Sequence, residues 1–331
     1  MDDIVTLDYG SGGKKTSALI EKLLLPALGN KALNDLGDGA ILPGGEQLVF
    51  STDSFVVSPC FFPGGDIGEL CVCGTVNDVS VSGGEAKYLS LSFIIEEGFP
   101  FSDLEKIVES IRSTAERAGV SIVTGDTKVV EKGRGDGIYI NTAGIGVLKY
   151  PGLSTRNIRE GDAVLLSGTA GDHGAAVMLS RSGLEGDLLS DAAPLNKLCA
   201  AVLESGAEVR CLRDPTRGGV ATTLNEFAED ANVTIVLKET DVPVREDVNA
   251  ACELLGLDPL YCANEGKLLC VVPEKDVERA LEAMRSVPEG VNAARIGTVS
   301  ASRGAGVLLE TAFGGTRILQ KLSGAQLPRI C

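Results

Sequence analysis

Short apolar runs alternate with amphipathic stretches along the whole chain, and this alternation predicts an α/β or α+β architecture. In the first half, the strand-like runs are rich in Val, Leu, Ile and Phe. The helical stretches repeat their apolar residues at helical spacing. The expected strands span 47–52, 88–95, 121–123 and 137–147, and the expected helices span 14–28 and 102–118.

The turn residues Tyr150-Pro151-Gly152 and the polar stretch 154–162 predict a domain boundary before a new strand at 163–166. We therefore expect an N-terminal domain over 1–150, a C-terminal α/β domain over 151–322, and a loose tail over 323–331 that lacks periodicity. The C-terminal domain is expected to hold helices near 172–181, 194–205, 216–230 and 274–285, and strands near 208–212, 233–238 and 266–272.

Charge narrows the possible functions. The 331 residues include 30 Lys and Arg against 46 Asp and Glu, a formal net charge of −16. Such a field repels phosphate backbones, which disfavours binding of DNA or RNA. An acidic protein that binds a triphosphate also needs divalent cations between its carboxylates and the phosphates.

Three features predict a cytoplasmic protein. The start, Met1-Asp2-Asp3-Ile4, has no basic region followed by an apolar core, as a signal peptide would. Apolar runs fall short of the roughly 18 residues that a membrane span needs. The nine scattered cysteines are an odd number, which favours reduced thiols.

The stretch Gly10-Ser11-Gly12-Gly13-Lys14-Lys15-Thr16 resembles a phosphate-binding P-loop but does not match its pattern. Asp8 stands at the first glycine position, and Lys15 stands at the hydroxyl position. Two interpretations stay open: a flexible turn before a helix, or a loop whose bare amides and lysines cover an anionic group.

Four aspartates stand at the ends of apolar segments: Asp38, Asp53, Asp78 and Asp126. Each alone is a plausible turn or cap residue. Together, in a half-chain without a histidine, they suit a hard cation such as Mg²⁺ with phosphate better than zinc.

The cysteines give little support for a metal cluster. On a helix, Cys71 and Cys73 would diverge by about 200°, and the single histidine, His173, excludes a multi-histidine site. A turn or cap role for His173 is favoured over catalysis. Cys331 differs because it is the last residue of the sequence, so its thiol is either incidental or a mobile carrier that visits an active site.

The chain resembles the HypE family of carbamoyl dehydratases from nickel–iron hydrogenase maturation. Most of the shared motifs also occur in a wider superfamily of aminoimidazole ribonucleotide synthetase, selenophosphate synthetase and thiamine-monophosphate kinase, whereas the ending Pro328-Arg329-Ile330-Cys331 points to HypE. The matching stretches are 10–13, 51–54, 61–65, 73–79, 124–130, 171–174, 213–219, 263–268 and 328–331.

The resemblance implies a two-domain α+β fold like that of aminoimidazole ribonucleotide synthetase, with an N-terminal sheet domain that pairs in a homodimer. It implies ATP and Mg²⁺, a carbamoyl group delivered by the carbamoyltransferase HypF onto Cys331, and transfer of cyanide to the HypC–HypD complex. The sequence departs from the family at Tyr9, where His is frequent, and from the superfamily at Gly39, where a second Asp is frequent. The implied ATP contacts are Gly10, Ser11, Gly12, Gly13, Thr52, Asn77 and Lys128, and the implied metal ligands are Asp38, Asp53, Asp78 and Asp126.

ATP-driven dehydration of a thiocarboxamide to a thiocyanate requires a leaving group made from the amide oxygen and a base for the nitrogen protons. We expect Cys331 to be the covalent carrier and Lys128 to steady the γ-phosphate or the developing oxygen charge. Glu265 is the expected base, and Asn264 is expected to orient either partner. For Glu265 the alternative is a turn residue before the next strand.

Other functions remain possible at this stage. A small-molecule kinase of the same superfamily would not need Cys331. A selenophosphate synthetase is disfavoured because the glycine segment has no cysteine. A non-enzymatic thiol carrier or metallochaperone would bind metal tightly without hydrolysing ATP.

Overall fold

The computed structural model describes residues 3–6, 9, 18–31, 33, 44–184, 186–301, 304–321, 327 and 329–331. The expected nucleotide loop Gly10-Ser11-Gly12-Gly13 and the expected metal ligand Asp38 lie outside the described residues. Within the described part, no helix has the length and apolar character needed to cross a membrane.

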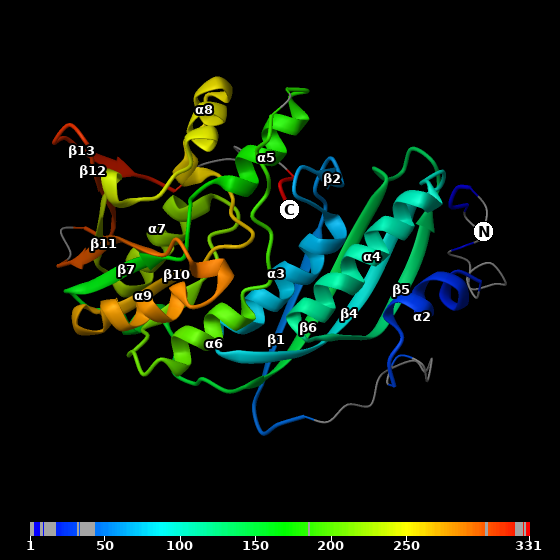
Figure 1. The fold of residues 1–331 in the computed structure, drawn as a ribbon, viewed down its shortest axis with the longest axis horizontal. Coiled ribbons are helices and arrows are strands. Elements are labelled where there is room, and N and C mark those ends of the chain that lie inside the picture. Colours follow the sequence, from blue (N-terminus) through cyan, green and yellow to red (C-terminus); the bar gives the residue numbers. More distant parts are fainter. Residues whose placement is uncertain are drawn as a thin grey trace.

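The N-terminal domain is a four-stranded sheet covered on one face by two helices, α3 and α4 (Figure 1). The strand order is β1-β6-β4-β5, antiparallel except between β4 and β5. The elements are η2 (Ile20–Leu24), α2 (Leu25–Leu28), β1 (Leu48–Phe55), β2 (Phe61–Phe62), β3 (Gly65–Asp66), α3 (Ile67–Val81), β4 (Gly84–Glu96), α4 (Phe101–Ala118), β5 (Ser121–Val130) and β6 (Ile138–Leu148).

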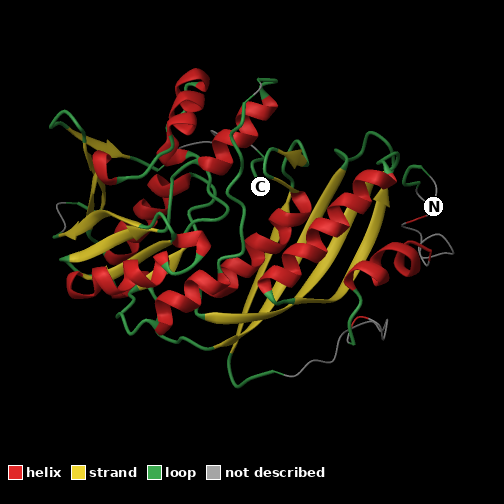
Figure 2. Cartoon of the chain, viewed as in Figure 1, coloured by secondary structure: helices red, strands yellow, loops and turns green. Residues whose placement is uncertain are grey.

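Alternating side chains give this sheet two different faces. On β4, Leu89, Leu91 and Phe93 are buried beneath the helices. The other face has no helix over it in the described structure (Figure 2), and it exposes apolar side chains, with Phe50 66% exposed. We call this second surface the open face of the sheet.

The C-terminal domain is a seven-stranded mixed sheet with order β13-β12-β9-β11-β7-β10-β8. Helix α7 packs against one face, and helices α6 and α9 pack against the other. Its elements are β7 (Asp162–Leu166), α5 (Asp172–Arg181), α6 (Asn196–Glu204), β8 (Cys211–Arg213), α7 (Gly219–Ala231), β9 (Thr234–Lys238), α8 (Glu246–Leu255), β10 (Leu269–Pro273), α9 (Val277–Arg285), β11 (Ala294–Ser300), β12 (Gly306–Glu310) and β13 (Thr316–Leu319).

These two layered domains confirm the predicted two-domain α+β fold. Helix α3 links them, because it packs on the N-terminal sheet and also contacts α6 and β8. The chain ends between α5, β2 and α3, where the two domains meet (Figure 1). Residues distant in sequence are therefore brought together at this junction.

Candidate active site between the domains

Helix α3 begins at a strong cap and carries Asp78 in its last turn. Asp66 accepts N–H hydrogen bonds from Gly68 (2.7 Å) and Glu69 (3.1 Å), which satisfies two amides that the first turn leaves unpaired. Near its middle, Gly74 lets β1 approach closely: a Cβ there would lie 3.0 Å from the Phe55 ring and 3.6 Å from Asp53 Oδ2. Asp53 therefore faces α3, on the covered face of the sheet.

Four carboxyl groups from different elements lie near enough at the junction for their charges to interact: Asp53 (β1), Asp78 (α3), Asp214 (before α7) and Glu265 (before β10). We call them the acidic cluster. Burial, followed by the charge of Asp78, raises the pKa of Asp214 to about 7. Burial is also the main cause that raises the pKa of Asp53 and of Asp78. The charges of Arg213 and Arg217 lower these pKa values, but burial outweighs them.

Glu265 is the most deeply buried member of the acidic cluster, 1% exposed. Burial, and then the charge of Asp214, raise its pKa well above the ordinary value. Among the described residues, its Oε1 atom has no hydrogen-bond partner. A buried, unpaired carboxyl oxygen costs free energy to maintain, which favours a functional role over the alternative of a simple turn residue.

A cleft of about 380 Å³ opens beside this cluster. Its wall includes Ser51, Asp78 and Arg213, together with Ser154 and Thr155 from the segment that joins the domains. Ser51 Oγ donates a 2.7 Å hydrogen bond to Asp78 Oδ2, which fixes this carboxylate at the mouth of the cleft. The cleft therefore offers a polar compartment next to the buried carboxyls.

Two expected site residues serve the protein's own backbone. Asn77 Oδ1 accepts from Leu195 N–H (2.7 Å), and its amide donates to Ala193 O (3.2 Å). Asn264 Oδ1 accepts from Gly171 N–H (2.7 Å), and its Nδ2 amide donates to Pro215 O (3.2 Å). Both side chains are fully buried. They brace the loops of the site, and the predicted contacts with ATP or substrate remain untested.

Asp126, Lys128 and Thr52 lie on the open face, opposite Asp53. The strand register pairs Asp53 with Thr142 and Asp126 with Ser92. Thr142 points to the covered face of the sheet, whereas Ser92 points to the open face. Strands β1 and β5 are also the two edges of the sheet, three spacings or about 14 Å apart. Within one chain, the structure thus does not bring Asp126 and Lys128 to the acidic cluster.

The donors present fit a hard cation. Within the residues described, no three His, Cys, Asp or Glu side chains gather as a ready metal site. Asp53 and Asp78 nevertheless offer two adjacent carboxylates, and Mg²⁺ is commonly held by one or two carboxylates with the rest supplied by phosphates and water. The unpaired Glu265 oxygen and the raised pKa of Asp214 indicate that a further positive charge would be favourable here.

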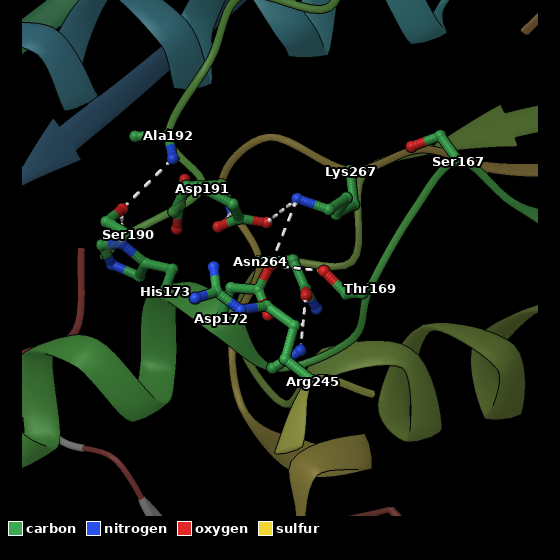
Figure 3. Close-up of polar contacts among 12 residues, drawn as sticks. Ser167, Thr169, Asp172, His173, Ser190, Asp191, Ala192, Arg245, Asn264 and Lys267 are labelled. Atoms are coloured by element: carbon green, nitrogen blue, oxygen red, sulfur yellow. Dashed lines mark hydrogen bonds and ion pairs between the residues drawn. The ribbon is translucent and has the colours of Figure 1, made fainter. Parts of the chain in front are cut away.

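A second buried group of charges contacts the loop that holds Asn264 and Glu265, and its three members are labelled in Figure 3. Lys267 Nζ lies 2.9 Å from Asp191 Oδ2 and 3.6 Å from Asp172 Oδ2. Asp191 also accepts the Glu265 N–H at 3.1 Å. We call Asp172, Asp191 and Lys267 the braced cluster, because a lysine holds both carboxylates and one of them fixes the backbone of Glu265.

The last residues of the chain dock at the same junction. Residues 329–331 run antiparallel to 56–58: Val56 N–H donates to Cys331 O (3.0 Å), and Ser58 N–H donates to Arg329 O (3.3 Å). Burial, and then the charge of Glu265, raise the pKa of the Cys331 thiol to about 12. The structure therefore brings Cys331 beside Glu265 and Asp53, in contacts that the expected loose tail did not include.

Sequence reasoning did not single out several residues at this junction. Asp214 and Arg217 belong to a stretch used only for the resemblance, and the charge of Arg217 lowers the pKa of Cys331 and of Asp53. His173 was expected to be a turn residue, but it contacts the docked tail. The signal available for Asp214 was its position in an Asp-Pro turn directly before a Gly-Gly helix start.

Known protein families and solved structures share this two-domain architecture. Family models of AIR synthase related proteins match residues 36–148 (N-terminal domain) and 159–310 (C-terminal domain). Carbamoyl dehydratase HypE of Azotobacter vinelandii is 54% identical over 333 residues, 99% of this chain and 97% of its own length. A crystal structure of hydrogenase maturation protein HypE in complex with ATP is 50% identical with a TM-score of 0.95, over 98% of this chain and 99% of that one. HypE from a HypE–HypF complex is 49% identical with a TM-score of 0.80, over 92% and 100%.

Proposed function

The chain belongs to the HypE family of carbamoyl dehydratases, and we propose that it dehydrates a carbamoyl group carried on Cys331 at the expense of ATP. One observation carries this proposal: Cys331 docks between the domains at the end of β1, near enough to Glu265 and Asp53 for their charges to raise the pKa of its thiol, after burial. A small-molecule kinase has no use for that placement. The similarity to carbamoyl dehydratases over 99% of the chain also favours the dehydratase over a kinase.

The proposed reaction converts Cys331–S–C(=O)–NH₂ and ATP into Cys331–S–C≡N, ADP and phosphate. ATP transfers its γ-phosphoryl group to the amide oxygen, which turns a poor leaving group into phosphate. The carbon–oxygen bond then breaks, and the two nitrogen protons leave as the triple bond forms. The atoms balance without an oxidant or a reductant.

Glu265 is the proposed base for the amide nitrogen. Its buried position raises the pKa of the carboxyl, which makes the ionised form a stronger base than an exposed glutamate. Its unpaired Oε1 is free of competing hydrogen bonds within the described structure. Asp191 fixes the backbone N–H of Glu265, so the base is held at one end while its carboxyl is available.

Asp53 and Asp78 are the proposed magnesium ligands, with Asp38 and Asp126 as the further expected ligands. When bound, Mg²⁺ would supply positive charge that offsets the phosphates and carboxylates. Ser51 orients Asp78 toward the cleft through its 2.7 Å hydrogen bond. The expected ATP contacts of Gly10, Ser11, Gly12 and Gly13 belong to this proposal as well.

We also propose a homodimer that pairs the open faces of two N-terminal sheets. Leu48, Phe50 and Ile94 are exposed on this face, and apolar patches of this kind mark interaction surfaces. Lys128 and Asp126 lie on the same face, far from the acidic cluster of their own chain. If Lys128 contacts the phosphates, it does so from the neighbouring subunit.

The proposed partners follow the chemistry of the carried group. HypF is the proposed donor of the carbamoyl group, supported by the HypE–HypF crystal structure of a 49% identical relative. The HypC–HypD complex is the proposed acceptor of cyanide. The reaction needs Cys331 as a free thiol, which supports a reducing compartment such as the cytoplasm.

Mass spectrometry of the peptide that contains Cys331 tests the proposal. The protein is incubated with HypF, carbamoyl phosphate, Mg²⁺ and ATP. A carbamoyl adduct should form on Cys331 and lose one water only when hydrolysable ATP is present. An unmodified Cys331, with HypF shown to be active, would overturn the dehydratase proposal and favour the kinase.

Two variants separate the carrier from the chemistry. Glu265→Gln and Lys128→Ala should accept the carbamoyl group normally but lose water at least about 100-fold more slowly. Cys331→Ala should accept no carbamoyl group at all. Wild-type rates of water loss in Glu265→Gln or Lys128→Ala would remove that residue from the mechanism.

Mixed dimers test whether Lys128 acts across the interface. Lys128→Ala and Cys331→Ala homodimers are each expected to be inactive. If Lys128 serves the neighbouring subunit, half of the sites in a mixed dimer are intact, and a random mixture should recover about a quarter of the wild-type rate. No recovery in confirmed mixed dimers would place Lys128 in its own chain's site or outside the mechanism.

A further inference from the structure

Each backbone carbonyl group of residues 329–331 has a defined donor, besides the ion pair between the Arg329 side chain and Asp136. Val56 N–H and Ser58 N–H hold Cys331 O and Arg329 O on one side. From α5, Arg181 Nη2 donates to Arg329 O (2.9 Å), and His173 Nε2 donates to Ile330 O (2.8 Å). The two helix residues belong to the C-terminal domain, so the tail is gripped from both domains.

The hydrogen bonds of His173 define its tautomer. A carbonyl oxygen only accepts, so Nε2 must carry the proton that is donated to Ile330 O. The other nitrogen, Nδ1, lies 2.8 Å from Ser190 Oγ. Because burial lowers the pKa of His173, the ring is neutral and Nδ1 accepts the hydroxyl proton of Ser190.

Ser190 is itself fixed in place (Figure 3). Its oxygen accepts the Ala192 N–H at 3.1 Å, and its own N–H donates to Pro63 O at 2.8 Å. The hydroxyl proton is therefore left for His173. The Phe62 ring meets the imidazole edge-on, with centroids 5.3 Å apart, which restricts rotation of the ring.

Ile330 is 2% exposed and packs into the core of the N-terminal domain. It directly precedes Cys331, so fixing its side chain and its carbonyl group leaves little freedom for the sulfur. Moving the tail out would uncover this side chain and break the hydrogen bond from a fully buried imidazole. The histidine thus lies where it can control how long the thiol group stays beside Glu265.

We propose that His173, held in its Nε2–H tautomer by Ser190, is a positioning residue that latches the tail and so places the sulfur-bound carbamoyl group at Glu265. This inference rests on the proposed function. The latch acts on water loss, which needs the docked tail. It does not assist carbamoylation, because the docked thiol is partly buried and its pKa is raised to about 12, which leaves little of the nucleophilic thiolate.

The test compares His173→Leu, which loses the donor, with His173→Gln, whose amide can still donate to Ile330 O. Alkylation of Cys331 by iodoacetamide, followed in the peptide after Lys321, reports how often the tail is undocked. His173→Leu should be alkylated about threefold to tenfold faster and, once carbamoylated, should lose water slower by a similar factor. His173→Gln should stay within about twofold of wild type.

Ser182→Ala is the matched control on α5, because Ser182 Oγ donates only to Met178 O of the same helix in the described structure and should leave both rates unchanged. If His173→Leu does not fold, Ser190→Ala replaces it, since it removes the hydroxyl group that holds His173 in its Nε2–H tautomer. Wild-type rates in the donor-deficient variant, or equal effects of Leu and Gln at position 173, would overturn the latch. Failure of wild-type protein to form the carbamoyl adduct would instead overturn the proposed function, and the alkylation rates would still decide the latch.

Discussion

The acidic cluster and the braced cluster both adjoin the short loop that carries Glu265, and among the described residues they differ in whether a lysine pairs with the buried carboxyl groups. In the braced cluster, Lys267 is within 4 Å of both Asp172 and Asp191. In the acidic cluster, Asp214 and Glu265 are also buried, but burial and the neighbouring carboxyl groups raise the pKa of both.

This difference separates carboxyl groups that support the fold from carboxyl groups that can take part in the reaction. A buried carboxylate that is paired with a cation is fixed in place and can hold the loop, as Asp191 does through the Glu265 N–H. Buried carboxyls without a partner keep a proton until a cation or a substrate arrives, and they are therefore able to exchange one. The loop carries Glu265, whose backbone N–H is held by Asp191 of the braced cluster and whose carboxyl belongs to the acidic cluster.

The largest expected effect comes from breaking the braced cluster. Lys267→Met leaves two buried carboxylates without their cation and should lower the free energy of unfolding by roughly 3–5 kcal/mol. Denaturant unfolding measures this loss. Lys321→Met is the control, because Lys321 pairs with Glu229 on the surface and should cost at most about 1 kcal/mol. Equal losses in the two variants would show that the braced cluster does not support the fold.

A smaller effect is expected from the pH dependence of the acidic cluster. The folded pKa of Asp214, about 7, is above its ordinary value near 3.8, so the folded state binds more protons between these pH values. The contribution of Asp214 to the free energy of unfolding is therefore largest at low pH and is lost as the pH rises to its folded pKa of about 7. The loss should reach about 2–3 kcal/mol between pH 5 and pH 8 in protein without divalent cations.

Asp214→Asn isolates this contribution from the rest of the titrating groups. Unfolding of wild type and variant is compared at both pH values, and the difference between the two proteins should shrink or reverse as the pH rises. A difference that does not change with pH would mean that Asp214 is ionised throughout this range. In that case the two clusters would not differ in the way described above.

Much of the fold could be predicted from the sequence, because local patterns determine it. Helices α4 and α5 begin and end within one residue of the expected ranges. Strand β5 was predicted only over 121–123 but runs to Val130. Its Gly125-Asp126-Thr127 segment has turn chemistry, yet Gly125 fits the close approach of β4, where a Cβ would lie 2.2 Å from Leu91 O.

The site was harder to predict because its residues meet only through tertiary packing. The sequence identified Asp53, Asp78, Glu265 and Cys331, which the structure brings together. It could not show that Asp126 lies on the opposite face, since a one-residue change of register moves a strand side chain to the other face. Nor could it assign His173, whose partner Ile330 is 157 positions away.

The smallest stability effect is expected at a third kind of carboxylate, exposed and paired. Asp126 lies 2.7 Å from Lys128 Nζ on the open face, with both side chains more than half exposed. Asp126→Asn should change the free energy of unfolding by less than about 0.5 kcal/mol, because water screens such pairs. Asp103→Asn, which breaks the ion pair with Lys106 on α4, should change the free energy of unfolding by a similarly small amount.

If Asp126 serves the site of a neighbouring subunit, only Asp126→Asn should slow water loss, by about tenfold or more. Equal turnover in the two variants would restrict the chemistry to the buried, unpaired carboxyls of the acidic cluster.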